Sequence, residues 1–351
     1  MRLGLRPDSL PERAALALGR VPTPFLQSHP TLLLARALVV AVERDVFETL
    51  RDGPRTARAV AEAAGTHEDA TASLLDALAG AGYLTKREAT YALSASARRW
   101  LLADSPTSLV DSLRFRAVEW EWMARLGDFL DTGEPLDFHA TMDADAWALY
   151  QRAMHALARL AVPETVRRTP MPTDARALLD VGGAHGAFSV AFCARYPALR
   201  AEVLDLPSAV EHAAPLLHAA AASAGVADRV AHRMGDILQV DLEPASYDVI
   251  FVGQLVHHFD AATCAALTAR LARALRPGGV LVIQEVMRET RPEANQLGAL
   301  GNLYFALTSA GGTRTFAELA GWQQAAGLTP LRPVRFRTLP GVGQQSARRT
   351  R

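Results

Sequence analysis

A glycine-rich stretch at residues 180–186, DVGGAHG, joins a short apolar run to a helical one. Glycines let the backbone turn tightly and approach a ligand, and the free amides of the following helix favour a negative or polar group. The run reads G-G-x-x-G with an acid two residues earlier, unlike the G-x-G-x-x-G of dinucleotide sites. It predicts a nucleotide-type loop, with a plain strand-to-helix turn as the alternative. The expected contacts are Asp180, Gly182, Gly183 and Gly186.

Two acids further along the chain would complete a nucleoside site. Asp205 ends the next predicted strand, where a carboxylate can accept both hydroxyls of a ribose; capping the following helix is its alternative role. Asp236 follows a weaker strand at 229–233 and can accept the exocyclic amine of adenine. We therefore expect an adenosine held over one sheet edge. Further contacts are expected from Leu206, Gly235, Ile237 and Gly253.

A parallel sheet would bring these residues together. From residue 177 onward, short apolar stretches predict strands at 177–181, 200–204, 247–252 and 280–284, and a helical stretch follows each. Such alternation is typical of an α/β fold with helices on both faces of the sheet. Ligands bind such folds at the carboxyl ends of the strands.

The N-terminal part has a different pattern. Apolar periodicity predicts helices at 31–50, 57–64 and 68–80, followed by short strands at 83–84 and 90–93. This order is typical of a winged helix, in which the second helix of the helix-turn-helix often binds DNA. The helix at 68–80 takes that position here, and it begins with acidic residues, which repel phosphate. We therefore expect a scaffold or dimerisation role and no nucleic-acid partner.

Two further helices are predicted at 107–131 and 145–161, and both carry aromatic and methionine side chains. Core packing is the ordinary reason for such side chains. Tyr150 and Met154 are nevertheless candidates for lining a flat aromatic ligand, because ligand pockets form where domains meet.

The domain boundaries follow from these patterns. Prolines at 170–175 predict a linker, and the stretch from residue 341 lacks apolar periodicity. We therefore predict an N-terminal domain at 1–169, a second domain at 170–340 and a flexible tail at 341–351.

The composition agrees with two globular domains. The chain has 351 residues, and 37 Lys and Arg balance 37 Asp and Glu, so its net charge gives no general attraction to nucleic acid or membrane. Its two cysteines cannot form a disulfide framework. The N-terminus lacks a secretory pattern, and the apolar run at 32–42 is shorter than the roughly 20 residues that cross a bilayer. We expect a cytoplasmic protein without a membrane partner.

Together these motifs resemble the class I S-adenosylmethionine-dependent methyltransferases, and among them the two-domain O-methyltransferases of the caffeic acid, acetylserotonin and bacterial polyketide type. The resemblance covers nearly the whole chain. It implies a Rossmann-like catalytic domain after a winged-helix-like dimerisation domain, a homodimer, and S-adenosylmethionine as the methyl donor that becomes S-adenosylhomocysteine. The matching stretches are DVGGAHG at 180–186, DLP at 205–207, GDIL at 235–238, VHHFDAATC at 256–264, LRPGG at 275–279, and GGTRT to AGL at 311–328.

The resemblance also implies a catalytic base. The family carries its base in the segment that corresponds to residues 256–259, in a register that selects His257. A histidine with a pKa of about 6.5 can take a phenolic proton as the methyl group moves. Glu285 matches the family acid that orients this base. Asn302 and Phe305 fall on the helix that caps the acceptor pocket, where ordinary helix packing is the alternative.

Three positions depart from the family pattern. His258 replaces an aspartate, Phe259 replaces a tryptophan, and Thr313 stands where an acid commonly precedes the arginine. A second carboxylate that steers the base is thus missing, so we expect a less tightly held base or an acceptor more acidic than a simple phenol. Neither an H-E-x-x-H pair nor an acidic magnesium cluster is present, so we expect no metal.

The predicted function is S-adenosylmethionine-dependent O-methylation of an aromatic or polyketide-type small molecule. Methylation at carbon or nitrogen, or another tailoring reaction on the same fold, is the alternative. A ligand-sensing winged-helix regulator is a third hypothesis. A nicotinamide dehydrogenase would need the dinucleotide fingerprint that this sequence lacks.

Overall fold

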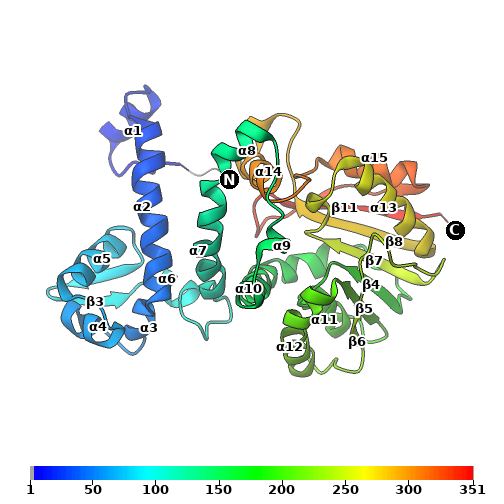
Figure 1. The fold of residues 1–351 in the computed structure, drawn as a ribbon, viewed down its shortest axis with the longest axis horizontal. Helices are drawn as coiled ribbons and strands as arrows, with labels where there is room; N and C mark the ends of the chain where they lie inside the picture. Colours follow the sequence, from blue (N-terminus) through cyan, green and yellow to red (C-terminus); the bar gives the residue numbers. More distant parts are fainter. Residues whose placement is uncertain (1–3, 351) are drawn as a thin grey trace. The chain divides into compact units, whose positions relative to one another are not determined.

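The computed structural model describes residues 4–350, which fold as two compact units that divide between Glu119 and Trp120 (Figure 1). The predicted domain boundary between residues 169 and 170 is therefore wrong. Helix α10 (Ala144–Arg168) precedes that boundary, yet its Ala158 and Ala161 pack into the same core as strands of the second unit. The helix belongs to the second unit because its apolar face is buried there.

The second unit is built on an eight-stranded sheet with the order β10-β11-β8-β7-β4-β5-β6, and β9 pairs with β11. The chain passes from β4 outward to β5 and β6, and then returns to the other side of β4 for β7 and β8. Where strand order reverses in this way, ligands bind at the carboxyl ends of the strands. The strands are β4 (Ala177–Val181), β5 (Arg200–Asp205), β6 (Val230–Met234), β7 (Tyr247–Gly253), β8 (Leu275–Val286), β9 (Leu328–Pro330), β10 (Val334–Arg335) and β11 (Val342–Arg349).

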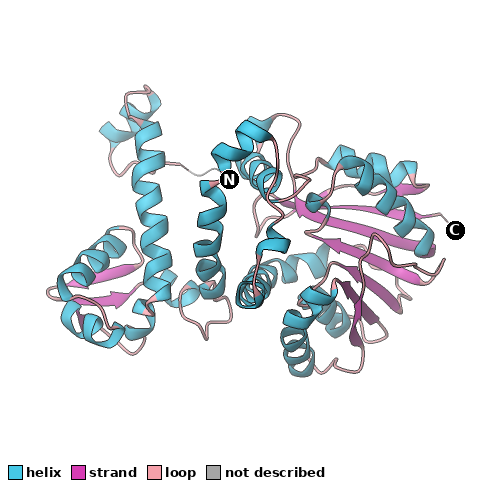
Figure 2. Ribbon diagram, in the orientation of Figure 1, coloured by secondary structure: helices cyan, strands magenta, loops and turns pink. Residues whose placement is uncertain are grey.

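Helices cover both faces of this sheet (Figure 2), so the predicted α/β fold is confirmed. Successive strand residues point to opposite faces. Leu178 and Phe251 pack with α10, α11 and α12, whereas Leu179 and Val252 pack with α13 and α15. The other helices of the unit are α8 (Leu126–Thr132), α9 (Phe138–Thr141), α11 (Ala187–Arg195), α12 (Pro207–Ser223), α13 (Ala261–Ala274), α14 (Gln296–Thr308), α15 (Phe316–Ala325), and the 3-10 helices η1 (Val256–His258) and η2 (Pro292–Ala294).

The predicted flexible tail is wrong for residues 342–349, which form β11 between β8 and β10. Gln344 is fully buried, and its Nε2 donates hydrogen bonds to Thr169 Oγ1 (3.0 Å) and Gln284 Oε1 (3.1 Å). Thr165 Oγ1 donates to the same Gln284 oxygen (2.8 Å). Buried polar side chains are stable when hydrogen-bonded. The strand lacks apolar alternation because hydrogen bonds to α10 and β8 take the place of apolar contacts.

The first unit contains the predicted helices at 57–64 and 68–80, followed by the predicted wing, and its small sheet has the order β1-β3-β2. Helix α4 begins after Thr56, whose hydroxyl accepts from Ala59 N, and ends at Gly65 with a φ of 64°. Asp45, with a φ of 51°, divides the predicted helix at 31–50 in two. The elements are α1 (Leu10–Ala17), α2 (Thr23–Glu43), α3 (Val46–Thr49), β1 (Arg55–Thr56), α4 (Ala57–Ala64), α5 (Glu68–Gly80), β2 (Leu84–Arg87), β3 (Thr90–Leu93), α6 (Ala95–Trp100), and α7 (Val110–Ala124), which runs into the second unit.

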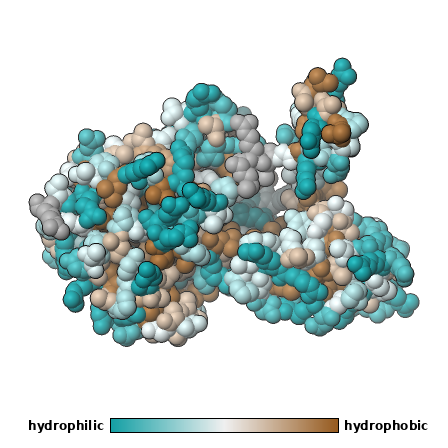
Figure 3. Space-filling view, turned by 180° about the vertical axis from the view of Figure 1, so that it is seen from behind, coloured by the Kyte–Doolittle hydropathy of each residue, from teal (hydrophilic) through white to brown (hydrophobic). Residues whose placement is uncertain are grey.

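Helix α2 is apolar but largely uncovered within its unit. Val39 and Val42 enter the core, whereas Leu32 and Leu33 are 55% and 63% exposed. Apolar surface is visible around α1 and the adjoining end of α2 (Figure 3). Among residues 4–350, α2 alone is long and apolar enough to cross a membrane, and 17% of its apolar window is buried. The apolar run at 32–42 is thus part of a longer helix whose exposed side is suited to a partner.

The hydrogen bonds to Gln284 predict a measurable stability loss. Replacing Gln284→Met keeps the side-chain volume but leaves the Thr165 hydroxyl and the Gln344 amide without their buried acceptor. We expect the free energy of unfolding to fall by about 1–3 kcal/mol. Urea unfolding followed by tryptophan fluorescence measures this change. Arg348→Ala, on the exposed part of β11, is the control; an equal loss in both variants would contradict the role of the buried network.

Candidate active site

The loop after β4 leaves no space for side chains at its glycines. Gly182 and Gly186 adopt φ angles of 67° and 66°, which other residues rarely adopt. A Cβ at Gly183 would lie 2.5 Å from Cγ of Asp180, and a Cβ at Gly186 would lie 2.5 Å from Leu217. The three glycines therefore let the loop backbone fold directly over the carboxyl end of the sheet.

Asp205, at the end of β5, binds this loop. Its carboxylate accepts hydrogen bonds from Ala184 N (2.9 Å) and Leu206 N (2.8 Å), and burial raises its pKa to about 6. The alternative role of Asp205 as the cap of α12 is wrong, because the cap position is Leu206 and no side chain bonds to the helix there. A carboxylate has room for about four hydrogen bonds, so Asp205 keeps acceptor capacity for further donors.

Asp180 is a buried carboxyl group beneath the same loop. Ser189 Oγ donates to its Oδ2 (2.7 Å), and Oδ1 has no hydrogen-bond partner among residues 4–350. Burial, with a smaller contribution from the nearby Asp205, raises the pKa of Asp180 to about 7. An unsatisfied buried oxygen beside a ligand loop fits a ligand that carries hydrogen-bond donors.

The end of β6 adds apolar surface beside these acids. Gly235 N donates to Asp205 O (2.9 Å), which ties β6 to β5, and Asp236 Oδ1 accepts from Leu238 N (2.8 Å). Leu206 and Met234 are 39% and 61% exposed. Carboxylates next to exposed apolar side chains fit an adenosine, which has hydroxyl and amine donors on a flat ring system.

Two other predicted contacts lie at the edges of this region. Ile237 is 7% exposed and packs in the core that includes α13 residues. Gly253 ends β7, and a Cβ there would lie 2.7 Å from the ring of Phe251. The ends of β4, β5, β6 and β7 thus share one edge of the sheet, as predicted for parallel strands.

His257 and Glu285 form a buried pair at the same edge. Glu285 Oε2 lies 2.8 Å from His257 Nδ1, and Glu285 Oε1 accepts from Val256 N (2.9 Å). The carboxylate side chain is 0% exposed and the imidazole side chain 5%. Because an ionised carboxylate only accepts, Nδ1 carries the hydrogen and Nε2 is left as the basic nitrogen.

Aromatic side chains lie against the His257 ring. The ring of Phe305, on α14, stacks on His257 with centroids 3.6 Å apart and an interplanar angle of 22°. The His258 ring lies 4.2 Å from that of His257, and its Nδ1 lies 2.9 Å from Ser309 Oγ. Burial lowers the pKa of His258 well below its usual value. His258 is therefore a neutral neighbour of the base at neutral pH.

The sequence analysis missed three members of this cluster. The ring centroid of His139, on α9, lies 5.1 Å from that of His258 and 5.3 Å from that of Trp147, on which the His139 ring stacks. The ring centroid of Phe138 lies 5.8 Å from that of His258. Burial lowers the pKa of His139 to about 4. The signal was the adjacent Phe-His pair in a short stretch between two predicted helices, which periodicity does not detect.

Helix α10 reaches the site at two places. The ring centroid of Tyr150 lies 5.8 Å from that of Phe138 and 6.0 Å from that of His139. One turn further, His155 lies 5.4 Å from His185 of the glycine loop. Met154 lies between them along the helix and is half-buried.

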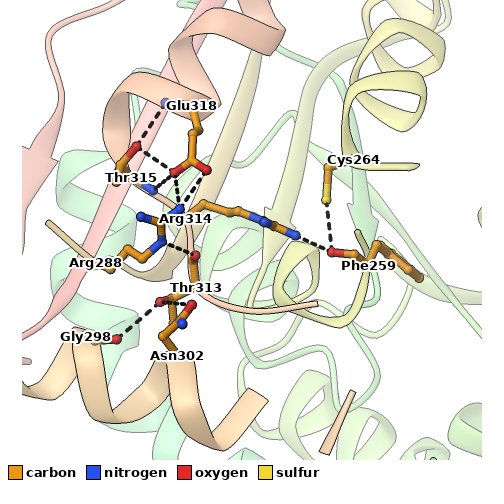
Figure 4. Close-up of polar contacts among 9 residues, drawn as sticks. All are labelled: Phe259, Cys264, Arg288, Gly298, Asn302, Thr313, Arg314, Thr315 and Glu318. Carbon is orange, nitrogen blue, oxygen red and sulfur yellow. Dashed lines mark hydrogen bonds and ion pairs between the residues drawn. The ribbon is translucent and has the colours of Figure 1, made fainter. Parts of the chain in front are cut away.

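Thr313 holds α14 instead of steering the base (Figure 4). Its Oγ1 lies 3.2 Å from both Gly298 O and Asn302 Oδ1. The Asn302 oxygen is thus used inside the protein, next to Gly312, where a Cβ would lie 2.8 Å away. Residues 4–350 contain no group of three or more His, Cys, Asp or Glu side chains that could hold a metal ion.

Comparison with known proteins shows the family to which the chain belongs. A model of the O-methyltransferase domain matches residues 130–329, and a model of the O-methyltransferase dimerisation domain matches residues 30–103. The chain belongs to the O-methyltransferase family. It is an S-adenosylmethionine-dependent O-methyltransferase, and the predicted family, fold class and cofactor are confirmed.

The similar proteins include enzymes of bacterial secondary metabolism. The chain is 32% identical over 322 residues to the tetracenomycin polyketide synthesis 8-O-methyl transferase TcmO of Streptomyces glaucescens, covering 89% of this chain and 93% of that one. It is 30% identical over 311 residues to the mitomycin biosynthesis 6-O-methyltransferase of Streptomyces lavendulae, covering 84% and 85%. Human N-acetylserotonin methyltransferase in complex with S-adenosylmethionine has the same fold, with a TM-score of 0.81, 18% identity and 99% of both chains covered.

The tight loop predicts a loss of cofactor binding. In the Gly183→Ala variant, the new Cβ and the Asp180 carboxyl group cannot keep their places, so the loop must shift. We expect S-adenosylhomocysteine to bind about 10-fold or more weakly by isothermal titration calorimetry, since 1.4 kcal/mol corresponds to each factor of ten. Gly321→Ala, on α15 with open space around the new methyl group, is the matched control. Unchanged affinity in a folded Gly183→Ala protein would refute the role of the loop.

Proposed function

We propose that the enzyme methylates a hydroxyl group of an aromatic or polyketide-type small molecule, with His257 as the general base. The observation that carries the proposal is the His257–Glu285 pair, buried at the carboxyl edge of the sheet with Nε2 free to accept a proton. Support for the acceptor class comes from the relatives named for mitomycin, tetracenomycin and acetylserotonin methylation.

The carboxyl edge of the sheet would hold the cofactor. Asp205 would accept the ribose hydroxyls and Asp236 the adenine amine, with Leu206 and Met234 against the ring and the glycine loop against the remainder. S-adenosylmethionine supplies a methyl group bonded to a positive sulfur, open to attack by an oxygen nucleophile. Alignment of the two reactants is worth on the order of 7–11 kcal/mol, so the main task of the protein is positioning.

The base is set up by its two neighbours. Glu285 accepts the Nδ1 hydrogen of His257, which selects the tautomer with a basic Nε2 and favours the imidazolium ion once it forms. The second Glu285 oxygen accepts from Val256 N, so the carboxylate itself is held in place. His257 would take the hydroxyl proton as the methyl group is transferred, without ionising the acceptor beforehand.

The aromatic cluster would form the wall against which the acceptor lies. It contains Phe138, His139, Trp147 and Tyr150 beside His258, and both imidazoles are neutral because burial lowers their pKa. Uncharged flat surfaces favour an apolar ring, with few polar groups to fix its orientation. Tyr150, Met154, Asn302 and Phe305 remain the proposed acceptor contacts.

Methyl transfer from labelled S-adenosylmethionine to a panel of phenols, hydroxyquinones and enols tests this function. We expect label on oxygen with the wild type, and a loss of about 10²- to 10⁴-fold in kcat for His257→Ala and a smaller loss for Glu285→Gln. Both variants should still bind S-adenosylhomocysteine. His218→Ala, an exposed histidine on α12, is the control. Product label on carbon or nitrogen, or a fully active His257→Ala, would overturn the proposal.

We further propose that α1 and the exposed side of α2 join two copies of the chain in the cytoplasm. The dimerisation model covers residues 30–103, and Leu10, Phe25, Leu32 and Leu33 are more than half exposed. Large apolar side chains exposed on one part of a surface indicate an interaction site. A second copy would bury the surface that a single chain leaves in water.

Light scattering after size exclusion measures the assembly. We expect twice the chain mass for the wild type and a shift towards monomer for the double variant Leu32→Glu/Leu33→Glu, because charges cannot be buried at an apolar contact. Leu130→Glu, on α8 with 71% exposure, is the control and should stay dimeric. A monomeric wild type, or one that partitions into vesicles, would refute the proposed interface.

A further inference from the structure

Most backbone N–H and C=O groups of residues 256–259 form hydrogen bonds. Val256 N donates to Glu285 Oε1, and Cys264 Sγ donates to Val256 O (3.3 Å). Gly312 N donates to His257 O (2.8 Å), and the Arg314 guanidinium donates to Phe259 O. Figure 4 shows Arg314 reaching across to Phe259 beside Cys264. The carbonyl groups on both sides of His258 are thus held by one segment, residues 311–314.

That segment is in turn anchored to the strand that carries Glu285. Arg288, three residues after Glu285, donates its backbone N–H to Arg314 O (3.0 Å) and its Nε to Thr313 O (2.9 Å). The Arg288 guanidinium also binds both oxygens of Glu318, at 2.8 and 2.9 Å, in the first turn of α15. The base and its orienting acid are therefore connected through residues 311–314 as well as directly.

Residues 311–314 pack tightly against the backbone of His257. A Cβ at Gly311 would lie 2.2 Å from His257 O and 2.6 Å from Phe259 O. Arg314 is 9% exposed, and its Nε has no hydrogen-bond partner in the described part of the chain. Burying a guanidinium group is costly unless its bonds are well made. Arg314 also lies over the Trp322 ring, with Cζ 5.6 Å from its centroid, and interacts with the Cys264 side chain. Its hydrogen bond to Phe259 O joins residues 311–314 to the loop that follows His257.

We propose that Gly311, Gly312 and Arg314 form a clamp that positions His257 through its backbone, in place of the second carboxylate that Thr313 does not supply. The proposal rests on the role of His257 as the base. Glu285 sets the tautomer and rotation of the imidazole, and the clamp sets where its Cα lies relative to the sheet edge. Arg314 is thus a positioning residue, and it does not touch the reacting atoms.

Arg314→Met tests the clamp, with Arg229→Met as the matched control. Arg229 also donates to backbone carbonyls, those of Cys193, Tyr196 and Leu199, but at the amino end of β6. Hydrogen exchange by mass spectrometry should show faster exchange of residues 255–260 in Arg314→Met alone, with the strand at 177–181 unchanged. We expect kcat, on the acceptor that wild type methylates fastest in the panel, to fall by about 10- to 100-fold. The Kd for S-adenosylhomocysteine should stay the same, and Arg314→Lys should recover part of the rate.

Equal rate losses in Arg314→Met and Arg229→Met, or unchanged exchange at 255–260, would overturn the clamp. If Arg314→Met is insoluble, Gly311→Ala decides the question with the same two measurements, because its methyl group displaces the His257 carbonyl directly. The exchange result does not depend on turnover. A fully active His257→Ala therefore refutes the proposed base, whereas unchanged exchange refutes the clamp alone.

Discussion

The hydrogen bond between His257 and Glu285 is the contact on which the site depends, and it forms because β7 and β8 are parallel neighbours. Gly253, the last residue of β7, pairs with Gln284, so Glu285, the next residue of β8, lies beside the segment that follows β7. Glu285 is completely buried, and a buried carboxylate is stable only when its oxygens are hydrogen-bonded. The Val256 amide and the His257 ring meet that need together. A change of register would separate His257 from Glu285 and leave a charge unpaired.

The same requirement for bonded polar groups holds the rest of the second unit together. Glu164, on α10, is 1% exposed and accepts from the backbone amides of Arg337 and Thr338. Although burial opposes it, hydrogen bonding by Thr338 and Arg337 lowers the pKa of Glu164 to about 2. This carboxylate and the Gln284 network attach α10 to the C-terminal strands. Helix α10, which carries Tyr150, is thereby joined to the sheet that carries Glu285.

Electrostatics divide the carboxyl edge into two parts. The ends of β4, β5 and β6 carry Asp180, Asp205 and Asp236, and burial raises the pKa of the first two towards neutrality. Beyond β7, the two imidazoles near His257, those of His139 and His258, stay uncharged because burial lowers their pKa. A cofactor with several hydrogen-bond donors fits the first part, and a flat neutral acceptor fits the second. His257 lies where the two parts meet.

Local sequence patterns were sufficient to predict the strands and the glycine loop at whose ends the candidate residues lie. The glycine loop, Asp205, Asp236 and His257 follow recognisable strands, and each strand predicted from 177 onward is present, because apolar runs and glycine turns depend on neighbours in the chain. Tertiary structure alone decided the boundary at Glu119, the pairing of β11, the place of His139 and Trp147 beside the base, and the contact of Arg314 with Phe259. These features join residues far apart in sequence through hydrogen bonds and ring contacts of polar or mixed residues. Such contacts leave no periodic pattern, since their stability comes from a partner that only the folded chain supplies.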